Sequence, residues 1–128
     1  MSDKRAEKIN EEIERQLEER GYVAIPDVLI GIGMLPEAKY NEWKKGNLRC
    51  LEDGCSADLS KLHNVLKAVK SYAEENGLKP SVVRYNADAK GALPLRFTMS
   101  NDPVRERLYS THYLDPWQAQ EIRRGRRK

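Results

Sequence analysis

The sequence predicts a mostly helical α+β fold: one small domain of helices with a single two-stranded β-hairpin. Two observations lead to this class. Residues 57–76 carry apolar side chains at helical spacing, and the pattern stops at Gly77. Two short strand-like runs follow, SVVRY (81–85) and PLRFT (94–98), joined by the turn-rich segment NADAKGAL. A length of 128 residues suits one domain.

Composition narrows the class of protein. Charged residues make up 34% of the chain, against roughly 25% in an average protein. The net charge is +3, and it is unevenly distributed: residues 1–20 hold seven acids and five bases, whereas residues 123–128 hold five bases and no acid. There is no signal peptide or apolar run of membrane-spanning length, and the two cysteines are most simply free thiols. The sequence therefore predicts a soluble cytoplasmic protein with no cofactor.

The first predicted element is a helix over residues 3–20, with Ser2 as its N-cap and Gly21 at its end. It is a charged rod with one narrow apolar stripe along it, formed by Ala6, Ile9, Ile13 and Leu17. Such a stripe packs either on the edge of its own domain or on a partner helix. The sequence leaves both open.

Two short helices are expected next. Pro26 suits the first turn of a helix that ends near Gly31 or Gly33, and Pro36 opens another that Gly46 ends. The short link GIGMLP predicts a tight helix–turn–helix pair. Residues 47–54 are expected to form a turn with a brief helix.

The remaining elements complete the predicted domain. Ser56 or Asp58 caps the 57–76 helix, and the hairpin follows it. Residues 104–114 are expected to form a last helix that Asp115-Pro116 breaks. A helix followed by a two-stranded ribbon is similar in layout to a winged-helix domain. We thus divide the chain into an N-terminal helix (1–20), a globular domain (22–114) and a basic C-terminal tail (115–128).

Three stretches carry a resemblance to known sequences. They are PDVLIGIGMLPEAKYNEWKKGNLRCLE, DLSKLHNVLKAVKSYAEENGLKPS and LPLRFTMSNDPVRERLYSTHYL. The pattern, over about residues 22–114, resembles a family of small uncharacterised bacterial proteins. That resemblance implies no catalytic role, and members of the family often have more basic residues in the hairpin than NADAKGA provides.

The solvent face of the 57–76 helix is the first candidate for nucleic-acid contact. Asn and Lys can read base edges in a major groove, while Ser contacts phosphate. The alternative is an ordinary solvated helix face. The candidate residues are Ser60, Lys61, Asn64, Lys67, Lys70 and Ser71.

Basic residues elsewhere extend this candidate. Alternation along the hairpin places Arg84 and Arg96 on one exposed face, with Lys90 in the turn. These cations can bind phosphates, or they can simply prevent other strands from pairing with the sheet edge. The tail attracts polyanions without sequence preference, unless it serves only solubility. Its bases are Arg123, Arg124, Arg126, Arg127 and Lys128.

Other groups of residues give weaker indications of a functional site. Tyr40 and Trp43 are three residues apart on one helix face and are expected in the core rather than stacked on a base. A zinc site is disfavoured because its ligands are irregularly spaced; these would be Cys50, Cys55, His63 and His112. No nucleophile, acid–base pair or complete dinucleotide motif is visible.

The sequence therefore favours a non-enzymatic nucleic-acid-binding module, for DNA rather than RNA. The alternative is a protein–protein adaptor or homodimer. That alternative uses the stripe of Ile9, Ile13 and Leu17 on the N-terminal helix.

Overall fold

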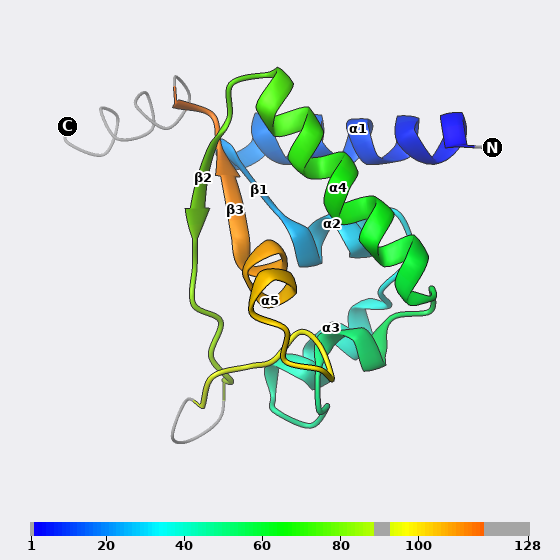
Figure 1. The fold of residues 1–128 in the computed structure, drawn as a ribbon, viewed down its shortest axis with the longest axis vertical. Helices are drawn as coiled ribbons and strands as arrows, with labels where there is room; N and C mark the ends of the chain where they lie inside the picture. Colours follow the sequence, from blue (N-terminus) through cyan, green and yellow to red (C-terminus); the bar gives the residue numbers. More distant parts are fainter. Residues whose placement is uncertain (1, 89–92, 117–128) are drawn as a thin grey trace.

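A small sheet lies along one edge of a helical domain in the computed structural model, which describes residues 2–88 and 93–116 (Figure 1). The described residues form five α-helices, one short 3-10 helix and three antiparallel strands, so the mostly helical α+β class is confirmed. In chain order the elements are α1 (Ser2–Arg20), β1 (Tyr22–Ala24), α2 (Ile25–Gly31), α3 (Glu37–Lys44), η1 (Leu51–Gly54), α4 (Leu59–Glu75), β2 (Lys79–Val82), α5 (Pro103–Ser110) and β3 (Thr111–Leu114).

Helix α4 forms where the apolar periodicity predicts it. The Asp58 side chain caps its start by accepting a hydrogen bond from the Lys61 backbone N–H at 2.9 Å. Gly77, with φ of 68°, ends it in a conformation that glycine adopts without strain. Its inward stripe is buried, namely Leu62, Val65, Leu66, Val69 and Ala73.

The pair α2 and α3 also follows its sequence signals. Pro26 lies in the first turn of α2, and the backbone N–H groups of Met34 and Leu35 both donate to the Leu29 carbonyl in the tight link between the helices. Trp43 of α3 is fully buried, and its indole Nε1 donates to the Arg96 carbonyl at 2.7 Å. The core placement of Trp43 is thus confirmed.

Helix α1 is part of the same core. Ile9 and Ile13 are buried in the main apolar cluster, Leu17 packs against it, and α1 lies along α4. Gln16 is buried too, and its Oε1 accepts from the Ala24 backbone N–H. Ile9, Ile13 and Leu17 therefore pack on their own domain, which is one of the two arrangements left open by the sequence, and a partner surface on this helix stays a prediction.

The sheet differs from the expected two-stranded hairpin. Its order is β1-β3-β2, so β2 pairs with residues 111–114 rather than with residues 94–98. The expected last helix ends at Ser110 because the Ser110 and Thr111 hydroxyls donate back to the carbonyls of Glu106 and Arg107. The β-prone run THYL then becomes the central strand.

Residues 94–98 do not form a strand, because other partners take their backbone groups. Residues 85–87 and 93–95 pair at the isolated Asn86–Pro94 bridge, where the Ala87 N–H donates to the Leu93 carbonyl and the Leu95 N–H donates to the Tyr85 carbonyl. Beyond it, the Arg96 and Phe97 carbonyls accept from the Leu51 and Glu52 backbone N–H groups. The Glu106 carboxylate accepts from the N–H groups of Phe97 and Thr98. The segment is held as a loop on η1 and α5.

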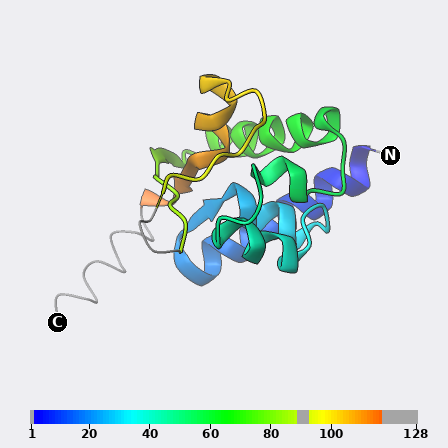
Figure 2. The same cartoon turned by 90° about the horizontal axis from the view of Figure 1, so that it is seen from below.

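The helices lie in two layers. Figure 2 shows α4 and α5 on one side of the molecule and α1, α2 and α3 on the other. In Figure 1 α5 lies between α4 and β2, and in Figure 2 it projects outward on the same side of the molecule as α4. Exposed residues of α4 and α5 therefore belong to the same layer of the molecule.

Candidate nucleic-acid interface

All six predicted contact residues of α4 are exposed: Ser60, Lys61, Asn64, Lys67, Lys70 and Ser71. Because each residue turns a helix by about 100°, Lys61 and Lys70 lie on opposite flanks of α4. Asn64 and Lys67 lie between them. A central polar line with one lysine on each flank matches a helix that meets base edges in the middle and a phosphate strand on either side.

The two predicted arginines are both exposed but do not share a hairpin face. Arg84 is the second residue after β2, whereas the Arg96 guanidinium donates to the Met99 carbonyl at 2.8 Å, at a groove described below. Helix α5, between α4 and β2, adds a cation that the sequence prediction missed. Arg107 is exposed there, three residues after the exposed Val104. Helical spacing places Arg107 on the face of Val104, but the exposure of that face is seen only in the structure.

Ion pairing divides the cations into two groups. Among residues with described side chains, the bases in ion pairs are Arg15, Arg20, Lys44, Lys45, Arg49 and Arg105. Nine others make no ion pair within this described part: Lys8, Lys39, Lys61, Lys67, Lys70, Lys79, Arg84, Arg96 and Arg107. Seven of these nine come after residue 59. The unpaired charge is therefore concentrated on α4, α5 and the segments flanking the sheet.

Net charge follows the same division along the chain. Residues 1–58 hold nine bases and 13 acids, a net charge of −4, whereas residues 59–128 hold 14 bases and seven acids, a net charge of +7. Some of the later acids are engaged with the protein itself. Glu106 accepts backbone hydrogen bonds, Asp102 caps α5 and Asp88 pairs with Lys44. Residues 89–92 and 117–128, which lie outside the described residues, hold six of these 14 bases and one of the seven acids, so the described residues after position 58 hold a net charge of +2.

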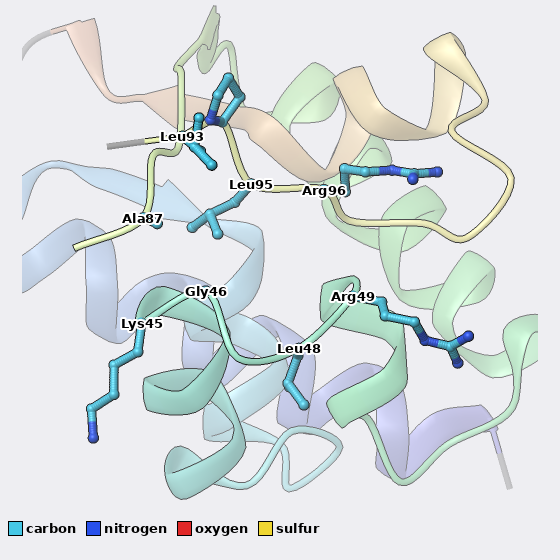
Figure 3. Close-up of a pocket in the computed structure, with 9 residues that line it drawn as sticks. Lys45, Gly46, Leu48, Arg49, Ala87, Leu93, Leu95 and Arg96 are labelled. Carbon is cyan, nitrogen blue, oxygen red and sulfur yellow. The ribbon is translucent and has the colours of Figure 1, made fainter. Parts of the chain in front are cut away.

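A groove lies beside this surface (Figure 3). Its volume is about 260 Å³. Residues 45–49 after α3 form one wall, and Ala87 with residues 93–96 forms the other. Figure 3 shows Lys45 at one end and the guanidinium groups of Arg49 and Arg96 at the other, with aliphatic side chains between them.

Titratable groups in the described core show no arrangement typical of an active site. Burial raises the pKa of Cys55 to about 12 and also raises that of Cys50, so both thiols stay protonated at neutral pH. His112 contacts Tyr85, and no cluster of three His, Cys, Asp or Glu side chains suited to a metal ion occurs in the described residues. Nor is any described helix long and apolar enough to cross a membrane.

Lys90 and the tail bases lie outside the described residues. The tail bases are Arg123, Arg124, Arg126, Arg127 and Lys128. Comparison with models of protein families, with curated proteins and with solved structures gives no match. The resemblance over residues 22–114 stays a prediction, and the function must be argued from this chain's own residues.

Proposed function

We propose that this protein is a non-enzymatic nucleic-acid-binding module, with DNA as the favoured ligand. The observation that carries the proposal is the concentration of unpaired, exposed cations on α4, α5 and Arg84 within the described part of the chain. Phosphate contacts supply most of the affinity of such proteins, and cations without carboxylate partners are free to make them. In this proposal, α4 enters the major groove with Lys61 and Lys70 on the two phosphate strands.

The proposed layout is winged-helix-like. Two features support it: α4 leads through Gly77 directly into β2, and the first strand pairs with the last one. Residues 83–110, which connect β2 to β3, take the place of a wing and include α5. Such a layout occurs in proteins with many functions, so the nucleic-acid ligand is inferred from the charges and not from the fold.

The test compares two charge-reversed variants of the full chain in a fluorescence anisotropy titration with duplex DNA. Lys67→Glu with Arg107→Glu acts on the proposed surface. Lys8→Glu with Lys39→Glu is the matched control, because both residues are exposed, unpaired in the described part and located on α1 and α3. Both variants change the net charge by the same amount.

We expect the first variant to weaken DNA binding strongly and the control to weaken it little. The slope of log affinity against log salt should fall by about 0.9 for each phosphate that the variant no longer neutralises. Equal weakening by both variants would show a general charge effect and contradict a localised interface. If the full-length chain does not bind duplex DNA even at low salt, the proposal fails. A parallel titration with duplex RNA tests the preference for DNA.

A further inference from the structure

The groove between residues 45–49 on one side and Ala87 with residues 93–96 on the other has a shape that the proposed function does not use. Its two walls are joined at both ends. The Asp88 backbone N–H donates to the Lys44 carbonyl at 2.7 Å, and the Leu51 N–H donates to the Arg96 carbonyl at 3.0 Å. The groove is therefore preformed, and a ligand need not order its walls.

The lining gives the groove a definite chemistry. Its middle is aliphatic, and one of these side chains, Leu93, is 71% exposed. Its ends are basic, with Lys45 on one side and Arg49 and Arg96 on the other (Figure 3). Among the described residues, no acidic side chain lines it. A complementary ligand has an apolar group in the middle and negative charges on both sides.

Three kinds of occupant are disfavoured. Proteins grip single-stranded nucleic acid by stacking bases on aromatic rings, and no aromatic side chain of the described chain lines this groove. A volume of about 260 Å³ is below the roughly 300–1,000 Å³ of typical small-molecule sites. The chain's own end, residues 123–128, has five bases and no acid, which is the wrong charge.

We propose that this groove binds a short acidic segment of a partner protein, seating one aliphatic side chain between carboxylates. The aliphatic side chain fills the space over Leu48 and Leu95, and the flanking carboxylates pair with the basic ends. In the structure Lys45 pairs with Glu42 at 3.5 Å and Arg49 pairs with Asp53 at 2.9 Å, both at the surface. Such exposed pairs contribute little, so an incoming carboxylate displaces them at small cost.

The test uses a fluorescein-labelled nonapeptide with four glutamates on each side of one leucine, titrated with the full-length chain at low salt. Replacing the leucine of the peptide by serine should weaken binding by about tenfold or more, because serine buries far less apolar surface in the groove. Arg49→Gln with Arg96→Gln should weaken it by about twofold to fivefold for each cation removed. Both arginines are exposed, so these substitutions do not threaten the fold.

Lys67→Gln with Arg107→Gln is the matched control, because it removes the same charge from the proposed DNA surface. It should leave peptide binding unchanged while weakening DNA binding, which separates this inference from the proposed function. No peptide binding, or equal weakening in both double variants, would overturn the inference. So would a single-stranded oligothymidylate that displaces the peptide and depends on Arg49 and Arg96, since the groove would then be a nucleic-acid subsite.

Discussion

At the scale of single residues, His112 lies in an environment that disfavours its protonated form. Its ring stacks on Tyr22 with centroids 5.0 Å apart, and its Nε2 lies 2.7 Å from the Tyr85 hydroxyl oxygen. Burial lowers the pKa of His112 below its ordinary value of 6.5. The positive charge of Arg20 lowers it further, and Asp27 opposes both effects. The folded protein therefore favours the neutral ring, which can accept a hydrogen bond from Tyr85.

This environment predicts a pH-dependent stability. The unfolded chain binds a proton at His112 near pH 6.5, whereas the folded chain does so only at lower pH. The neutral His112 ring therefore contributes its full stabilisation of the folded protein above about pH 6.5. This stabilisation is lost as the pH falls through the lowered pKa that His112 has in the folded state. Urea unfolding at pH 7.5, 6.5 and 5.5 should show that the free energy of unfolding declines as the pH falls. In the His112→Gln variant this decline should be smaller. An identical decline in both proteins would assign the effect to other groups.

At the scale of elements, the sequence identifies helices better than strands. The apolar spacing and caps of α1 and α4 are local signals. The predicted bounds of these two helices lie within two residues of the observed ones. The strands depend on competition between distant groups. Residues 94–98 have a strand-like pattern, but the backbone of residues 51–52 and the carboxylate of Glu106 take their hydrogen bonds. The residues of PLRFT themselves do not indicate that these distant groups bind their backbone.

Glu106 predicts a measurable consequence of that competition. Its carboxylate accepts from the backbone N–H groups of Phe97 and Thr98 and from the Thr98 hydroxyl. Glu106→Ala should lower the free energy of unfolding by about 2 kcal/mol, because it removes hydrogen bonds to a charged group. Glu75→Ala, at an exposed position of α4, is the control and should change it by less than about 0.5 kcal/mol. Equal effects in urea unfolding would contradict the holding role of Glu106.

At the scale of the whole molecule, the candidate interface was only partly predictable. The solvent face of α4 follows from helical periodicity, since six positions opposite an apolar stripe must face outward. The place of Arg107 depends instead on α5 lying on the same side of the molecule as α4, which is a tertiary arrangement. The groove likewise joins residues about forty positions apart. Periodicity places residues on a face, but only packing decides which faces adjoin.

The packing of α1 decides whether its apolar stripe is part of the domain's own core or an interface between two copies of the chain. Ile13 is fully buried against the domain's own core, so Ile13→Ala should lower the free energy of unfolding by about 2–5 kcal/mol through the cavity that it leaves. Lys8→Ala on the exposed face of the same helix should change it by less than about 0.5 kcal/mol. Urea unfolding measures both variants.

Size-exclusion chromatography of Ile13→Asp then separates an internal core from an intermolecular seam. If α1 is part of the core, a buried charge unfolds the chain or shifts its unfolding midpoint sharply, because an unpaired charge is costly away from water. If the stripe instead joined two copies, the same substitution would yield a folded monomer whose own unfolding midpoint does not depend on protein concentration. A stable folded monomer of Ile13→Asp, derived from a parent dimer, would therefore contradict the packing of α1 on α4 and restore the stripe as an interface.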